Sequence, residues 1–190
     1  IDKVNAADRD RIKGEALFLR GLMYFELVKL YAKPYSAGNI TTNLGLQVVT
    51  VPTVNGNVTA ANLVARSTVK ETYDQILADL TAAKPLMADD YGVYAGTHAA
   101  SAVLSRVYLQ MEDFAKARDE ANAVITNSGA SLEILYSNAF NNTSPSKEDI
   151  FVLPITAQDG INDMHTYWSI RAYGARAGDV EINQSHLDLY

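Results

Sequence analysis

The feature that most constrains the fold is a pair of apolar segments, residues 95–111 and 114–126, with only Glu112 and Asp113 between them. Both segments place apolar residues at the spacing of three and four that is typical of amphipathic helices. A connection of two residues forces two helices to lie antiparallel and side by side. The pair is a helical hairpin of about 34 residues, which is the period of a tetratricopeptide repeat.

Another apolar segment, near the start of the chain, predicts a long helix over residues 5–33. This helix ends before Pro34 because the residue preceding a proline avoids the α region. Nearly every side chain in residues 16–31 is apolar, and this indicates a central helix covered by its neighbours. Gly21 is expected to permit a close approach of another helix.

Two arginines and four tyrosines on the predicted helices are interpreted as structural residues. Arg20 lies on an otherwise apolar side of its helix, so we expect it to pair with a carboxylate from a neighbouring helix, and Arg106 receives the same interpretation. The tyrosines are expected to belong to the core rather than to a binding surface; they are Tyr24, Tyr31, Tyr73 and Tyr108.

After the helix predicted for residues 5–33, residues 35–65 are rich in Asn, Thr, Gly and Val and predict a long excursion between helices. A short strand is expected at residues 45–49. Ser67 or Thr68 is expected to cap the next helix, with Glu71 near its third position, as in a capping box. Pro85 is expected to end or bend that helix.

Helical periodicity fades after Gly129, where an Asn-Ser-Gly sequence predicts a helix stop. Residues 148–154 predict a short strand closed by a proline. We therefore predict a mainly α fold of tetratricopeptide-like helical hairpins, with long irregular insertions and a few short strands. Residues 1–190 are expected to form a single domain, with a helical core at about 5–129 and a loop and short-strand region at about 130–190.

Composition excludes several classes of protein. The formal net charge of −6 argues against nucleic-acid binding, because phosphate contacts need a basic surface. The absence of cysteine excludes disulfides and thiolate chemistry. No apolar run approaches the ~18 residues of a membrane-spanning helix. The chain begins without Met and without a signal-peptide pattern, so we expect a processed protein or part of a longer one.

Four segments, in this order, resemble the SusD/RagB family of outer-membrane nutrient-binding lipoproteins. Residues 14–28 resemble the family's "AEA-x-FLRA…YF-x-LV" helix, and residues 66–80 resemble "R-x-[ST]-V-x-E-x-Y-x-x-I-x-x-DL". Residues 99–117 resemble "AA-x-A-LLARVYLY-x-GDY-x-x-A", and residues 148–151 resemble the short "E-x-IF" segment. Each motif is weak alone, but four in one order are specific, and together they cover roughly residues 10–155.

The sequence departs from the family pattern at a few positions. Gly14 and Gly21 stand where alanine is usual, and residues 110–112 differ at the turn between the third and fourth helices. Because family members are several hundred residues long, the resemblance implies a partial SusD-like domain. The lipid-modified cysteine expected of the family would then lie outside residues 1–190.

The resemblance also implies a function. Such proteins are surface-exposed at the outer membrane of the cell, capture oligosaccharides or polysaccharides, and deliver them to a SusC-like TonB-dependent transporter. They are not enzymes, and neither a cofactor nor a metal is implied. The expected partners are therefore a glycan and the transporter, with no nucleic acid and with membrane contact only through the lipid anchor.

Candidate glycan-binding residues come from the composition of the last region, because no family motif fixes them here. Sugar C–H groups pack on aromatic rings and hydroxyls pair with Asp, Asn and Arg, so the segment around the only tryptophan is the best candidate. The candidates are Asp163, Tyr167, Trp168, Arg171 and Tyr173. The alternative is that Trp168 plugs the core beneath its loop.

Catalysis finds little support in the sequence. The three histidines lack metal-ligand spacing, and there is no G-x-S-x-G nucleophile elbow, P-loop or dinucleotide-binding glycine pattern. Two other functions remain open. One is a tetratricopeptide-like scaffold that binds a protein partner in its groove, and the other is a helical hydrolase whose catalytic residues lie outside this chain.

Overall fold

The computed structural model describes most of the chain. The described residues are 3–52, 56, 60, 63–89, 94–139, 144–154, 156, 158, 160, 163–168, 176 and 182–189. They fall into two compact units, Ile1–Val152 and Leu153–Tyr190, which we call the helical unit and the C-terminal unit. Each unit is described by itself.

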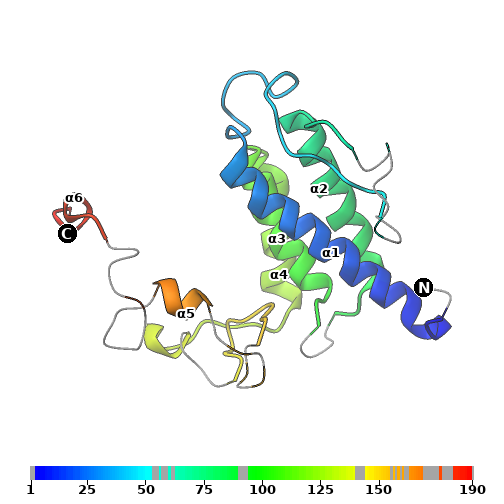
Figure 1. The fold of residues 1–190 in the computed structure, drawn as a ribbon. Coiled ribbons are helices and arrows are strands. Elements are labelled where there is room, and N and C mark those ends of the chain that lie inside the picture. Colours follow the sequence, from blue (N-terminus) through cyan, green and yellow to red (C-terminus); the bar gives the residue numbers. More distant parts are fainter. Residues whose placement is uncertain are drawn as a thin grey trace. The chain divides into compact units, whose positions relative to one another are not determined.

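The helical unit contains the four long helices, as Figure 1 shows. They are α1 (Ala6–Tyr31), α2 (Val69–Ala83), α3 (Thr97–Gln110) and α4 (Phe114–Asn127). Shorter helical segments are η2 (Lys84–Leu86), η3 (Tyr136–Ala139), α5 (Asp163–Trp168) and α6 (Gln184–Leu187). The mainly helical fold predicted from the sequence is confirmed. None of the described helices is both long enough and apolar enough to span a membrane.

Helices α1 and α2 form an antiparallel pair. The early residue Gly14 of α1 lies against Ala83 at the far end of α2 and against Met87 just beyond η2, whereas Gly21 lies against Leu80 within α2. A Cβ atom on Gly21 would stand 2.9 Å from Cγ of Leu80, closer than real Cβ contacts allow. The two glycines therefore let the helices approach each other closely, as predicted for Gly21.

The start of α2 is fixed by its own sequence. The backbone N–H of Glu71 donates to Oγ1 of Thr68 (3.1 Å), and the N–H of Thr68 donates to Oε2 of Glu71 (2.7 Å). This confirms the predicted capping box, with Thr68 as the N-cap. Hydrogen bonds from Thr68 hold the pKa of Glu71 below its ordinary value. Pro85 lies in the 3₁₀ turn η2, where the α-helical conformation ends, as expected.

The core lies where α1, α2 and α3 meet. Its largest fully buried side chains include Phe18 and Phe25 from α1, Ile76 and Leu80 from α2, and Leu104 from α3. Sixteen buried residues form one continuous apolar cluster, so the helical unit has a single core.

Aromatic rings join the irregular segments to this core. The rings of Tyr73 and Tyr35 meet edge to face with centroids 4.8 Å apart, and those of Phe18 and Phe151 do so at 5.2 Å. Burial raises the pKa of the Tyr73 hydroxyl above its ordinary value. Phe151 therefore ties residues 148–152 to the helices.

The predictions for the other helix tyrosines are only partly right. Tyr24 and Tyr108 are half-buried and pack against the core cluster. Tyr31 is 66% exposed, so its assignment to the core is wrong. It is the last residue of α1, where no described element covers its ring.

The two predicted strands, residues 45–49 and 148–154, are wrong. In the described part of the chain, the β-type pairing near the first consists of one isolated bridge, between Leu44 and Thr68. The N–H of Leu46 donates to Oγ1 of Thr72 (3.0 Å), inside α2. The first segment thus forms hydrogen bonds with the start of α2 rather than with another strand. The second segment packs on the helices through Phe151 and has no strand structure.

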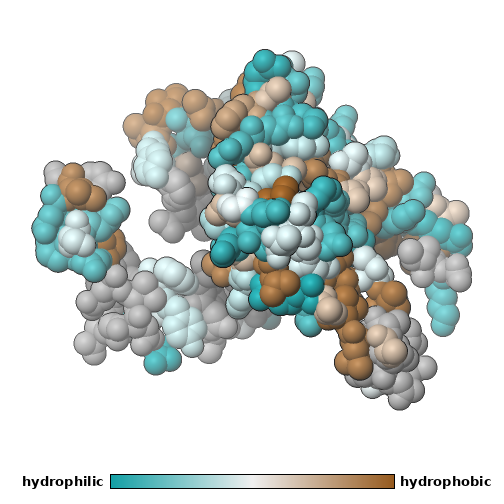
Figure 2. All heavy atoms as spheres, turned by 90° about the horizontal axis from the view of Figure 1, so that it is seen from above, coloured by the Kyte–Doolittle hydropathy of each residue, from teal (hydrophilic) through white to brown (hydrophobic). Residues whose placement is uncertain are grey.

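One side of α1 carries apolar side chains that the described residues leave uncovered. They are Leu19, Met23, Leu27 and Leu30, with exposed fractions between 41% and 77%. The prediction that this helix is covered nearly all round is therefore wrong for the described structure. On the face of the molecule drawn in Figure 2, hydrophobic residues lie among hydrophilic ones.

The predicted hairpin of α3 and α4 is confirmed, and its turn holds an unusual backbone conformation. Glu112 has a φ of 61°, in the left-handed region. Asp113 then caps α4 by accepting a hydrogen bond from the N–H of Lys116 (3.2 Å). The family pattern that residues 99–117 resemble has glycine at the position of Glu112. A side chain is strained in this conformation, whereas glycine is not.

Replacing Glu112 by glycine should therefore stabilise the helical unit. Relief of the left-handed conformation is worth ~1–2 kcal/mol, and the greater freedom of glycine in the unfolded chain offsets ~0.5–1 kcal/mol of it. We expect a net gain of about 0.5–1 kcal/mol in the free energy of unfolding, measured by chemical denaturation followed by far-ultraviolet circular dichroism. Glu112→Ala is the matched control, because it removes the carboxylate and keeps the strain. An equal gain in both variants would contradict the backbone explanation.

Candidate functional site

The predicted glycan-binding segment forms the short helix α5 of the C-terminal unit. Its last two residues, Tyr167 and Trp168, are 41% and 67% exposed. Trp168 is therefore not buried within its own unit. Asp163 begins the same helix. Arg171 and Tyr173 lie outside the described residues.

A cation that the sequence analysis missed lies beside this aromatic pair. The guanidinium carbon of Arg176 is 5.5 Å from the centroid of the Tyr167 ring, a cation–π distance. The backbone N–H of Arg176 donates to the carbonyl of Thr166 (3.0 Å) in α5. Arg176 follows the helix by eight residues without any periodic pattern, so local sequence signals could not have placed it there.

The chemistry available at α5 fits a neutral polar ligand. Two partly exposed aromatic rings offer flat apolar faces at the end of α5. No group of three or more metal-ligating side chains occurs among the residues that the structure describes. Exposed aromatic rings of this kind offer a stacking face to the apolar surface of a ligand.

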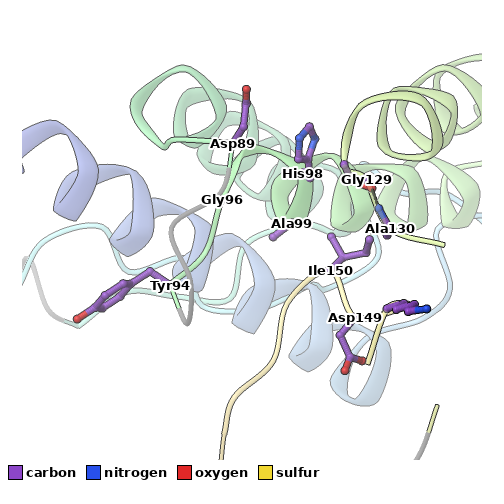
Figure 3. Close-up of a pocket in the computed structure, with 11 residues that line it drawn as sticks. Asp89, Tyr94, Gly96, His98, Ala99, Gly129, Ala130, Asp149 and Ile150 are labelled. Atoms are coloured by element: carbon purple, nitrogen blue, oxygen red, sulfur yellow. Dashed lines mark hydrogen bonds between the residues drawn. The ribbon is translucent and has the colours of Figure 1, made fainter. Parts of the chain in front are cut away.

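A small cavity of about 250 Å³ lies at the start of α3. Figure 3 shows Asp89 and His98 side by side and pointing the same way, whereas Tyr94 and Asp149 point away from them. Ser128 also lines this cavity, but its Oγ accepts from the N–H of Ala130 (3.1 Å).

The polar groups of this cavity do not form a catalytic arrangement. A nucleophilic serine requires a hydrogen bond to its base. No hydrogen bond in the described part of the chain joins Ser128 to His98. The labelled side chains do not converge on one point either, as Figure 3 shows.

A further cavity lies at the end of α1, and the sequence analysis missed it. Its volume is about 380 Å³, and its lining includes the exposed Tyr31 together with Gln47 and Arg66. Because Tyr31 was expected in the core, nothing in the sequence pattern singled it out. The exposure of its ring is the signal that only the structure provides.

Comparison with known proteins gives one family. The profile of SusD-like_3, described as "Starch-binding associating with outer membrane", matches residues 1–109, which is more than half of the chain. Among curated proteins, SusD-like protein P2 of Formosa agariphila is 29% identical over 165 residues, which cover 83% of this chain and 29% of that protein.

Solved structures agree with this match. A SusD superfamily protein from Bacteroides thetaiotaomicron is 32% identical with a TM-score of 0.72, covering 84% of this chain and 34% of that one. A putative sugar binding protein from Bacteroides vulgatus is 27% identical with a TM-score of 0.73, covering 91% of this chain and 40% of that one. The chain thus spans between 29% and 40% of the length of these relatives.

Proposed function

Because this chain belongs to the SusD-like family, whose profile describes starch binding and association with the outer membrane, we propose that it captures glycans at the cell surface. The whole protein would bind oligosaccharides or polysaccharides and pass them to a SusC-type TonB-dependent transporter. It would act by binding rather than by catalysis. Attachment to the outer membrane would come from a lipid anchor outside residues 1–190.

The observation that carries this proposal is the exposed Trp168 next to Tyr167 at the end of α5. Tryptophan and tyrosine rings supply large contact areas at binding surfaces, because each combines an apolar body with a polar group. The C–H faces of a pyranose ring would stack on these rings, close to the guanidinium of Arg176. Asp163, Arg171 and Tyr173 remain proposed members of this site.

Replacing Trp168 by alanine should weaken glycan binding about tenfold or more, because truncation of a central aromatic contact typically costs more than 1 kcal/mol. Affinity electrophoresis with starch, laminarin, xylan and pectin, followed by calorimetry with whichever polymer retards the unmodified chain, measures the loss. Trp168→Phe keeps an aromatic face and should retain most of the affinity.

Tyr136→Ala is the matched control, since it removes a tyrosine that is 82% exposed and lies outside α5. Unchanged affinity in a folded Trp168→Ala variant would contradict the assignment of the site to α5. If none of the four polymers retards the unmodified chain, the glycan-binding proposal itself fails. A tetratricopeptide-like scaffold for a protein partner would then be favoured, with the uncovered side of α1 as its first candidate surface.

A further inference from the structure

The helical unit holds a second aromatic surface that is built differently from α5. We propose that the cavity lined by Tyr31, Gln47 and Arg66 binds one pyranose ring of a neutral glycan, as a subsite separate from α5. This inference rests on the proposed glycan-binding function. The cavity is an open depression of the surface with a volume of about 380 Å³, which suits partial contact with one sugar ring.

The walls of this cavity are held in place by Arg66. Its Nε donates to the carbonyl of Gly45 (2.8 Å), and its Nη2 donates to the carbonyls of Tyr31 (2.8 Å) and Leu44 (3.4 Å). One side chain thus joins the last residue of α1 to the loop that follows it. A carbonyl at the helix end, which lacks a partner within the helix, is satisfied at the same time. A site held in this way loses little conformational freedom when a ligand binds.

The groups of this cavity that the hydrogen bonds above do not use are of the kinds that bind a sugar. Within the described part of the chain, the hydrogen bonds of Arg66 use Nε and Nη2 and leave Nη1 as a donor. Gln47 donates from Nε2 to the carbonyl of Val64 (2.9 Å), so its amide oxygen remains an acceptor in a fixed position. The ring of Tyr31 is 66% exposed and supplies a stacking face. The three residues that carry these groups all line the same cavity.

The charge around the cavity favours a neutral sugar over an acidic one. The guanidinium of Arg66 already faces backbone carbonyls, one of them at the C-terminus of α1, where the helix dipole places partial negative charge. The chain as a whole carries a net charge of −6, which repels polyanions. Arg66 is therefore expected to donate to hydroxyl groups rather than to pair with a carboxylate.

The test uses the full 190-residue chain with Trp168 replaced by alanine, so that binding at α5 is suppressed. Calorimetry is done with the polymer that retards the unmodified chain most strongly among starch, laminarin, xylan and pectin. We expect residual binding in Trp168→Ala that falls about tenfold further when Tyr31→Ala is added. Tyr31→Phe should keep it, because the ring remains. Leu30→Ala, at a neighbouring exposed residue, is the matched control and should have no effect.

The outcomes separate this inference from the proposed function. If the unmodified chain binds a polymer and Tyr31→Ala leaves the residual affinity unchanged, or Trp168→Ala alone abolishes binding, the second subsite is overturned while glycan binding stands. Preferential binding of pectin that depends on Tyr31 would overturn the neutral-sugar assignment. If the unmodified chain binds none of the four polymers, both proposals fail. Equal losses in Tyr31→Ala and Leu30→Ala would also overturn the stacking role.

Discussion

Replacing Arg20 by methionine is expected to lower the free energy of unfolding of the helical unit by about 2 kcal/mol. This is less than the roughly 3–5 kcal/mol for breaking a fully buried ion pair, because the side chain of Arg20 is 35% exposed. Nε and Nη2 of Arg20 donate to the two carboxylate oxygens of Asp79 at 2.7 and 2.6 Å. Asp79 is only 2% exposed, so the substitution would leave a buried carboxylate with the amide of Gln75 as its remaining partner (2.8 Å). Hydrogen bonding to Asp79 raises the pKa of Arg20 above its ordinary value.

A double substitution distinguishes the stability lost with the ion pair from the stability lost with side-chain packing. In Arg20→Met with Asp79→Leu no charge remains buried, and replacement of a whole ion pair by apolar residues is often neutral. We therefore expect this variant to recover most of the stability lost in Arg20→Met, measured by urea denaturation followed by far-ultraviolet circular dichroism. A double variant that is less stable than Arg20→Met would show that the loss does not come from the unpaired carboxylate.

Replacing Gly45 by alanine is expected to destabilise the helical unit by about 2–3 kcal/mol, because overpacking against atoms that cannot move costs this much. A Cβ atom on Gly45 would stand 2.3 Å from Oγ1 of Thr72 and 2.5 Å from the carbonyl oxygen of Thr68. Thr68 is the N-cap of α2, so its backbone cannot shift without loss of the cap. The same loop carries the carbonyl that Arg66 binds, so the variant should also disturb the cavity at the end of α1.

Gly21→Ala is the matched control for this substitution. Its Cβ would also be too close to a neighbour, at 2.9 Å from Cγ of Leu80, but that neighbour is a side chain rather than backbone. Alanine is also a better helix former than glycine by ~1 kcal/mol, which offsets part of the overpacking, so the loss should be smaller than in Gly45→Ala. Thermal unfolding of the two variants gives the comparison. A loss in Gly21→Ala as large as that in Gly45→Ala would contradict the role assigned to backbone contact.

The features predicted correctly are those that depend on neighbouring residues in the sequence. The capping box of Thr68 and Glu71 needs only three residues, and the α3–α4 hairpin follows from the shortness of its link. The sequence also predicted that Arg20 needs a carboxylate partner. It could not say which one, because Asp79 lies 59 residues away and is brought near by helix packing.

The wrong predictions concern interactions with distant parts of the chain. Apolar periodicity gives the direction of a side chain on a helix, but not whether another element covers it, and so Tyr31 was placed in the core. The alternation at residues 45–49 resembles a strand, yet the partner for Leu46 is a threonine inside α2. Arg106 was expected to form an ion pair, but it is exposed and has no such pair in the described residues.

The candidate sites show the same contrast between features set by nearby residues and features set by distant parts of the chain. Composition was enough to choose the segment around Trp168, because a single tryptophan in an irregular segment is conspicuous. The contact of Arg176 with Tyr167 and the cavity beside Arg66 depend on how segments far apart in the sequence come together. Of the predicted set, Arg171 and Tyr173 lie outside the described residues and stay predictions.

The position of the only tryptophan has an optical consequence. Trp168 belongs to the C-terminal unit, whereas all four long helices belong to the other unit. Indole emission therefore reports on α5 and its surroundings, and the amide signal of the helices reports on the rest. The two units therefore give separate spectroscopic signals, fluorescence for one and circular dichroism for the other. A single sample can show whether they unfold together or one after the other.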